Sequence, residues 1–493
     1  MTFSDVLQVV GSAGRFQLLH VVLILIPCLL FPSFDLIQNF SAATPKHHCR
    51  VPWLQNSSLM YNFSDSLVNI TKETLLRVAI PQDQDSLSSC SRYVQPQWQL
   101  MLNDSVDLLD HEVEPCIHGW EFDSSEFSST IVTEWNLVCK QQALKQVAQS
   151  VYMGGLLAGG VVLGSLADKF GRRKIMLICN ACIALIGTFI AFAPNLIVYM
   201  VARFFIGMAL IGQNLNSFSL GLEWLDERHR VIFVTILSCC YTTGQFILAG
   251  LGHGIRNWRS LQLAVAIPYY FIFLFSWFHP ESTRWLVLHG KYEDALQCFQ
   301  KVAKINGKPF TEATLNLEIL KKEMENEEKG FLRKTYTALD LIRITELRRY
   351  TLIMSLFWFI TSFVYFSIIL NLQDFGLSIP LLMVVFAAFD YPAKLLSMRV
   401  INIGRRICQG GFLLLAGSAC ICLVFVPEGL YHKNMIFGVS RDLVRWIGLM
   451  MGQKEGNRHD VHVENKCNWN TSVYFKIDNK IHVILEETVD MSH

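Results

Sequence analysis

Long runs of apolar residues recur along the chain, and shorter polar or charged segments separate them. Each run has roughly 17–25 residues, the length that a helix needs to cross the hydrocarbon core of a bilayer. The runs lie near Phe16–Phe34, Val147–Leu163, Ile175–Phe192, Leu196–Ile211, Val231–Leu251, Trp258–Phe278, Tyr350–Leu370, Ile379–Leu396 and Gly411–Val426. This pattern predicts an all-α membrane protein with about nine transmembrane helices.

The composition agrees with a membrane protein and argues against other classes. Of the 493 residues, 52% are hydrophobic and only 17% are charged, which is little charge for the surface of a soluble protein. The net charge of +1 provides no global field that would attract nucleic acid. The sequence contains no phosphate-binding loop, no HExxH motif, no zinc-type spacing and no nucleophile–base constellation. We therefore expect neither an enzyme nor a bound metal or cofactor.

Basic residues set the expected orientation, because Lys and Arg are retained on the cytoplasmic side of membrane proteins. They follow the second, fourth, sixth and eighth apolar runs. The positions are the turn Lys169–Lys174, Arg228 and Arg230, the charged loop 281–348, and Arg405 with Arg406. Counting runs from these positions places residues 1–15 in the cytoplasm, with Arg256 and Arg259 as the exception on the outer side.

The polar segment 35–143 between the first two runs is then expected to be extracellular. It carries five glycosylation sequons, at Asn39, Asn56, Asn62, Asn69 and Asn103. It also carries Cys49, Cys90, Cys116 and Cys139. Four cysteines in an oxidising compartment predict two disulfides, and three pairings remain open.

The other polar regions complete the expected division of the chain. Within the cytoplasmic loop 281–348, the segment Leu315–Lys329 has mixed charge at helical spacing, which indicates solvated linking helices. The first transmembrane helix is expected at 16–34, helices two to six at 144–280, helices seven to nine at 349–427, and a divergent polar tail at 428–493.

The segment Gly164–Lys174 forms a tight, cation-rich turn between two apolar runs. Gly164 allows backbones to approach closely, and Gly171 allows a turn that a Cβ would hinder. Asp168 can accept hydrogen bonds from neighbouring guanidinium groups. In the run before this turn, Gly155 and Gly159, then Gly160 and Gly164, stand four residues apart, which predicts close helix packing and no contact with substrate.

This turn resembles the loop between the second and third helices of the major facilitator superfamily. Other motifs resemble the organic anion transporters of solute carrier family 22, over about residues 1–430. They are Gly14–Gln17, Asn39–Phe40, Ser129–Cys139, Glu223–Trp224, Gly244–Gly250, Pro280–Leu286 and Asp390–Lys394.

The resemblance implies a bundle in which twelve helices form two related halves, with substrate bound near the midplane. Gly404-Arg-Arg406 echoes Gly171-Arg-Arg173, but Ile401 stands where the first copy has Asp168. The residues assigned to gating and structural support are Gly164, Asp168, Gly171, Arg172, Arg173, Arg203, Glu223, Glu281, Arg284 and Asp390. Among these, Glu281 and Arg284 are three residues apart and can face each other.

Lys394 is the principal candidate for contact with the substrate. A charge at membrane depth is costly and usually faces a cavity or a partner. The resemblance assigns this lysine to the central site, where it attracts the anionic group. Asp390 lies four residues earlier on the same helical face and can pair with it. The alternative is an ion pair with a purely structural role. The two interpretations are compatible if the substrate anion competes with Asp390 for the lysine.

Aromatic and polar residues complete the expected substrate site. Trp358, Tyr365 and Phe366 fall where the family lines its site with aromatics, whose faces suit flat organic anions. The alternative for this stripe is packing against lipid or other helices. Tyr241 and Gln245 lie one helical turn apart and can add hydrogen bonds.

Asp35 departs from the family pattern, which favours a neutral amide at this position. An acid here repels anions at long range. An organic cation or zwitterion is therefore the alternative substrate class, unless Asp35 pairs with a cation from another helix.

The resemblance decays after Pro427, and the family's last three helices are expected to be absent. The inherited function is that of a plasma-membrane secondary transporter of small organic anions, working by alternating access in exchange for a counter-anion such as a dicarboxylate. The alternative is a truncated, non-transporting member that is retained or associates with a full-length relative. A homo-oligomer is compatible with either.

Overall fold

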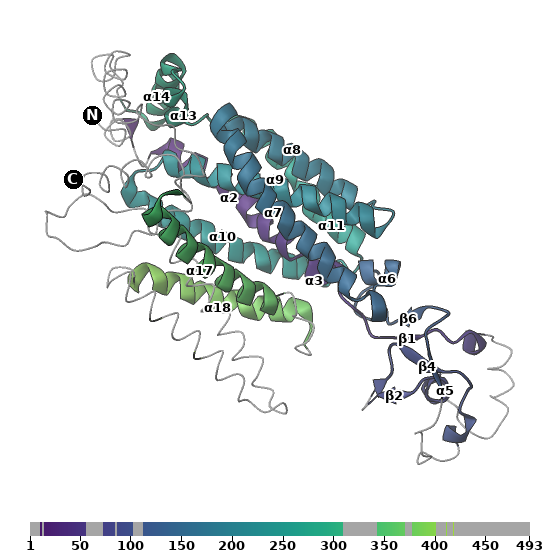
Figure 1. Ribbon diagram of the computed structural model, residues 1–493. Helices are drawn as coiled ribbons and strands as arrows, with labels where there is room; N and C mark the ends of the chain where they lie inside the picture. The colour runs from purple at the N-terminus through teal and green to yellow at the C-terminus, as the bar shows by residue number, and fades with distance from the viewer. Residues whose placement is uncertain are drawn as a thin grey trace.

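The computed structural model describes residues 10–11, 14–55, 72–83, 86–101, 112–308, 343–369, 377–400, 411 and 418. Helices dominate this part of the chain and run side by side in one bundle (Figure 1). The bundle consists of α2 (Arg15–Leu36), α3 (Gln38–Ser41), α7 (Ala143–Phe170), α8 (Arg172–Ile190), α9 (Leu196–Glu223), α10 (Glu227–Gly254), α11 (Trp258–Ala266), α12 (Pro268–Phe275), η4 (Ser276–Phe278), α17 (Thr345–Ile369) and α18 (Ile379–Val400).

Seven helical stretches within the described residues are long and apolar enough to cross a membrane. They are Arg15–Ser41, Cys139–Phe170, Arg172–Ile190, Leu196–Glu223, His229–Gly254, Trp258–Phe278 and Ile379–Leu396. The seventh predicted run is also helical, as α17. The ninth run, the repeat of the basic turn at 404–406 and the tail lie outside the described residues, apart from Gly411 and Ser418.

The predicted end of the fourth membrane helix, at Ile211, is wrong. α9 continues to Glu223, because the polar residues beyond Ile211 are buried inside the bundle and hydrogen-bonded there. The Gln213 amide donates to Ser217 Oγ over 3.0 Å, and the Asn216 amide donates to the Gly212 carbonyl over 2.7 Å. A hydropathy pattern marks such residues as the end of a membrane helix, although a bundle interior satisfies them.

Glycines set the close contact between α7 and α9. A Cβ at Gly155 would lie 2.9 Å from the Phe204 carbonyl carbon, and a Cβ at Gly159 would lie 2.6 Å from the Met208 oxygen. The close approach expected at Gly160 and Gly164 is not found, because a Cβ at either position would meet no described atom within 4 Å. These two glycines lie on another side of the helix, since each residue advances the direction by about 100°.

The segment between α3 and α7 folds as a small cap at one end of the bundle, and α13 (Thr283–Leu288) and α14 (Tyr292–Asn306) cover the other end (Figure 1). The strands of the cap form three antiparallel pairs: β1 (His47–Cys49) with β6 (Trp120–Phe122), β2 (Gln82–Asp83) with β3 (Ser86–Leu87), and β4 (Ser91–Tyr93) with β5 (Val113–Pro115). Short helices join them: η1 (Pro52–Gln55), α5 (Lys72–Ala79), η2 (Trp98–Met101), α6 (Ile131–Trp135) and η3 (Cys139–Gln141).

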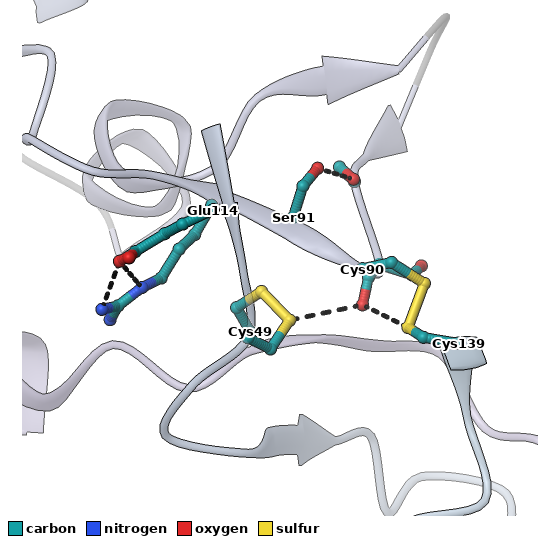
Figure 2. Close-up of a disulfide and its surroundings, with 9 residues drawn as sticks. Cys49, Cys90, Ser91, Glu114 and Cys139 are labelled. Atoms are coloured by element: carbon teal, nitrogen blue, oxygen red, sulfur yellow. Dashed lines mark hydrogen bonds and ion pairs between the residues drawn. A yellow bond between two sulfur atoms is a disulfide. The ribbon is translucent and has the colours of Figure 1, made fainter. Parts of the chain in front are cut away.

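Two disulfides hold the cap together. Cys49 is bonded to Cys116 and Cys90 to Cys139, which selects one of the three open pairings. The Ser89 carbonyl oxygen lies 3.8 Å from Cys116 Sγ and 3.5 Å from Cys139 Sγ, so the two bonds are neighbours (Figure 2). Because strands of two or three residues bury little apolar surface, these cross-links carry much of the stability of the cap.

Asn39 is the one predicted glycosylation site of the loop 35–143 that lies within the described residues. It lies in α3 and is only 6% exposed, so a glycan at this position would require the helical turn to open. Asn56, Asn62, Asn69 and Asn103 lie outside the described residues.

At the opposite end, α14 holds the start of α2 through one side chain. Asn306 Oδ1 accepts a 2.9 Å hydrogen bond from the Phe16 N–H in the first turn of α2. The Asn306 amide nitrogen lies within 3.1 Å of the Val10 and Gly11 carbonyl oxygens and 3.0 Å from Gln17 Oε1. Gly14, at the N-cap, has no side chain that could do this, so Asn306 acts as a remote helix cap.

Replacing Asn306 by Ala is expected to lower the thermal midpoint of the purified protein in detergent. The change removes a helix cap, typically worth about 1 kcal/mol, and leaves backbone groups of the N-terminal segment without partners. Lys304→Ala, at an exposed position of the same helix, is the matched control. Equal midpoints for the two variants would show that Asn306 does not hold α2.

Candidate functional site

Lys394 and Asp390 form a buried ion pair on α18. Lys394 is 2% exposed and Asp390 is 0% exposed. Lys394 Nζ lies 2.6 Å from Asp390 Oδ2, so the pairing expected from the four-residue spacing is present. A charge pair away from water is stable only if the remaining donors and acceptors also find partners.

α10 supplies those partners. The Lys394 ammonium donates to the Ser238 carbonyl over 2.7 Å and to the Thr242 hydroxyl. Thr242 in turn donates to Asp390 Oδ2 over 2.5 Å. Thr242 is fully buried, and its hydroxyl oxygen contacts both charged groups. Sequence reasoning missed Ser238 and Thr242, because more than a hundred residues separate them from α18 and local spacing carries no signal of such contacts.

The residue before Thr242 reaches the other side of α10. Tyr241 donates its hydroxyl to Asp35 Oδ2 on α2 over 2.9 Å. α10 packs against both α2 and α18. In Figure 1 it lies between α2 and α7 on one side and α17 and α18 on the other. Two neighbouring residues of one helix therefore contact a buried carboxylate on α2 and a buried ion pair on α18.

Two further hydroxyls join α10 to α18 beside this network. Thr243 Oγ1 lies 2.5 Å from the hydroxyl of Tyr391, which also lies 3.4 Å from the Cys239 carbonyl oxygen. The ring of Tyr391 stacks on Phe246, with ring centroids 6.0 Å apart. α10 thus presents both polar and aromatic contacts to α18.

The predicted aromatic residues lie on α17, in the same half of the chain as the ion pair. Tyr365 and Phe366 meet edge to face, with ring centroids 5.1 Å apart, and both pack against the main apolar core. Trp358 lies about two turns earlier and is half-buried. Gln245 is 2% exposed and lies one turn beyond Tyr241 on α10.

Arg203, on α9, is completely buried and binds two neighbouring helices. Its guanidinium donates to the Phe34 carbonyl on α2 over 3.1 Å and to Gln149 Oε1 on α7 over 2.9 Å. It also lies 4.2 Å from the ring centre of Tyr152, a cation–π distance. These contacts are those of a residue that fixes the relative positions of α2, α7 and α9.

The turn Gly164–Lys174 contacts two other segments at its end of the bundle. Gly171 has φ +102°, a conformation that favours glycine. Arg172 forms an ion pair with Glu223 at the end of α9. Trp285 of α13 donates its indole N–H to the Asp168 carbonyl over 2.7 Å.

Glu281 caps α8, the helix that follows this turn. Its Oε1 accepts the backbone N–H of Arg173 over 3.0 Å and that of Ser282 over 3.1 Å. The Arg173 guanidinium donates to the Trp277 carbonyl over 2.7 Å. Glu281 therefore joins the turn to the start of α13, a contact that its expected pairing with Arg284 did not suggest.

Comparison with known proteins identifies the family of the chain. The family described as "Sugar (and other) transporter" matches residues 124–440. "Solute carrier family 22 member 6-B" of Xenopus laevis is 43% identical over 430 residues, which cover 87% of this chain and 76% of that relative. "Organic anion transporter 3" of Homo sapiens is 42% identical over 440 residues, which cover 89% of this chain and 77% of the relative.

A solved structure agrees with the fold. The xylose transporter XylE from E. coli, in a partially occluded inward open conformation, superposes with a TM-score of 0.52 at 14% identity, over 90% of this chain and 88% of that one. Identity this low supports only the fold, whereas the relatives at more than 40% identity identify the branch of the family. The chain is a membrane transporter of the major facilitator superfamily and belongs to the organic anion transporter branch of solute carrier family 22.

Proposed function

We propose that the chain carries small organic anions across the plasma membrane by alternating access, with Lys394 receiving the anionic group. The observation that supports this most is the burial of Lys394 at the contact between α10 and α18. It is the one buried lysine in the described part of the chain. Because a buried charge is costly, a buried lysine in a membrane helix favours a functional role.

The aromatic and polar residues proposed for the site suit an aromatic anion. Trp358, Tyr365 and Phe366 offer ring faces and edges on α17, and Tyr241 and Gln245 offer polar groups on α10. In this proposal, an aromatic carboxylate or sulfonate would place its charge at Lys394, and its ring would contact the aromatic residues of α17.

The turn Gly164–Lys174, with Glu223 and Glu281, is proposed as part of the gate. Its contacts join α9 and α13 to this end of the bundle, and in this proposal they break and reform as access alternates. No ATP-binding motif occurs in the sequence, so gradients would drive transport, and exchange against a dicarboxylate or another internal anion is the proposed form.

The proposed orientation places residues 1–15 and the loop 281–348 in the cytoplasm and the cap outside the cell. The two disulfides of the cap support this, since such bonds persist in oxidising compartments. Glycosylation is proposed at Asn56, Asn62, Asn69 and Asn103.

Asp35 supports a second candidate, a transporter of organic cations or zwitterions. It is a carboxylate on α2 that is only 5% exposed, and Tyr241 connects it to the same helix that contacts Lys394. A substrate with a positive group would find its counter-charge at Asp35.

Uptake of two permanently charged aromatic probes distinguishes these candidates. Cells expressing the chain are given radiolabelled naphthalenesulfonate or N-methylpyridinium, and surface biotinylation measures how much protein reaches the plasma membrane. Saturable uptake of the sulfonate alone is expected. Uptake of pyridinium alone would favour the Asp35 alternative, and uptake of neither, despite surface arrival, would mean that the chain does not transport these classes.

A further inference from the structure

We propose that the buried carboxylate of Asp35 makes the anion site selective for monovalent over divalent organic anions. This inference rests on the proposed anion site and adds to it the charge of the preferred substrate. Asp35 lies on α2 and is 5% exposed, so little water screens its charge. Its field opposes each negative charge that a substrate brings to Lys394.

The neighbours of Asp35 suit a negative charge. Tyr241 donates its hydroxyl to Asp35 Oδ2 over 2.9 Å. The guanidinium of Arg203 donates to the carbonyl of Phe34, the residue before Asp35, over 3.1 Å. Tyr152, whose ring centre lies 4.2 Å from that guanidinium, interacts electrostatically with both Asp35 and Arg203. A hydroxyl donor and a nearby cation compensate a buried carboxylate, so we expect Asp35 to be ionised.

The buried charged side chains of the described residues cancel in the empty site. They are Asp35 and Asp390, which are negative, and Arg203 and Lys394, which are positive. A monovalent anion adds one negative charge to this set, and a divalent anion adds two. Because net charge at membrane depth is costly, the second negative charge of a substrate is opposed more strongly than the first.

Asp35 lies near enough to the proposed anion for its charge to act there. Adjacent residues of α10 join the two places, since Tyr241 contacts Asp35. Thr242, the next residue, contacts Lys394. On α2, Cys28 interacts electrostatically with Lys394. Cys28 and Asp35 are about two turns apart, or about 10 Å along the helix.

The expected effect is large enough to measure. At roughly 10 Å and an effective dielectric constant of about 20, the repulsion between two unit charges corresponds to about tenfold in affinity. The Coulomb energy is proportional to the charge of the substrate, so the factor for a divalent anion is about the square of that for a monovalent one. In the proposed exchange, the same field favours a monovalent counter-anion over a dicarboxylate.

The test compares two inhibitors of similar size and different charge. A naphthalenedisulfonate carries two permanent negative charges. A naphthalenesulfonate with a neutral sulfonamide in place of the second sulfonate carries one. Inhibition constants are measured against the uptake of radiolabelled naphthalenesulfonate, with rates normalised to surface protein. We expect the singly charged inhibitor to bind the wild type about tenfold more tightly than the disulfonate.

Three variants identify the group that sets this preference. Asp35→Asn removes one negative charge, so the preference should fall by about tenfold and the two inhibitors should bind with similar affinity. Asp35→Glu keeps the charge and should keep the preference. Tyr241→Phe removes the hydrogen bond to Asp35 but no charge, so it should keep the preference even if both inhibition constants change.

The proposal fails if the wild type binds both inhibitors equally, if Asp35→Asn keeps the preference, or if Asp35→Glu or Tyr241→Phe loses it. If Asp35→Asn does not reach the surface, the wild type and Asp35→Glu still decide, since both must prefer the singly charged inhibitor. Absence of saturable naphthalenesulfonate uptake by wild-type protein at the surface would overturn the proposed function itself. Saturable uptake that both inhibitors reduce equally would overturn only the selectivity.

Discussion

Replacing Lys394 by Met is expected to abolish saturable uptake of naphthalenesulfonate. The change removes the proposed anion-binding charge and leaves Asp390 buried without its cation. Truncating one member of a buried, hydrogen-bonded charge pair costs about 2–5 kcal/mol, which corresponds to a loss of roughly thirtyfold or more. Part of that cost falls on folding, so the amount of mature protein should fall too.

The double variant Lys394→Met with Asp390→Asn separates the two effects. Replacing both members of a buried pair removes the unpaired charge and is often neutral for stability. We expect the double variant to reach the surface at a level close to that of the wild type and still to fail in uptake. Normal uptake by the double variant would show that the pair has only a structural role.

Gly155→Ala is expected to prevent formation of the mature transporter. The added Cβ would lie 2.9 Å from the carbonyl carbon of Phe204 and 3.1 Å from its Cα, which are backbone atoms of α9 that cannot rotate away. Overpacking typically costs about 1–3 kcal/mol, and more where the backbone itself must move. The fraction of the protein at the cell surface, measured by biotinylation, should fall severalfold.

Gly160→Ala is the matched control, because it adds the same methyl group to the same helix. A Cβ at position 160 would meet no described atom within 4 Å. The fraction at the cell surface should be unchanged or slightly raised, since Ala favours a helix more than Gly does. Equal losses in the two variants would contradict the account of the contact between α7 and α9.

The sequence predicted the features that depend on local pattern. Apolar runs located the membrane helices, because a helix that crosses a bilayer is predominantly apolar over about 20 residues. The pairing of Asp390 with Lys394 also followed from local spacing, since residues four apart share a helical face. Four cysteines in one loop predicted two disulfides, although only the structure selects the pairing.

Other features depend on contacts between distant segments, and the sequence could not show them. Thr242 and Ser238 contact Lys394 only because α10 packs against α18. Asn306 caps α2 by a hydrogen bond to Phe16, which lies 290 residues earlier. Gly155 and Gly164 both belong to pairs of glycines spaced four residues apart. Only Gly155 lies on the side of α7 that contacts α9. Gln213 and Asn216 seemed to end a membrane helix because their buried partners were unknown.

Equilibrium binding to the purified, full-length chain tests the central claim most directly. Radiolabelled naphthalenesulfonate is titrated in detergent against the wild type and the double variant Lys394→Met with Asp390→Asn, and thermal midpoints confirm that both are folded. We predict saturable binding to the wild type that the double variant lacks. Equal binding to two folded proteins would contradict the assignment of Lys394 as the group that receives the anion.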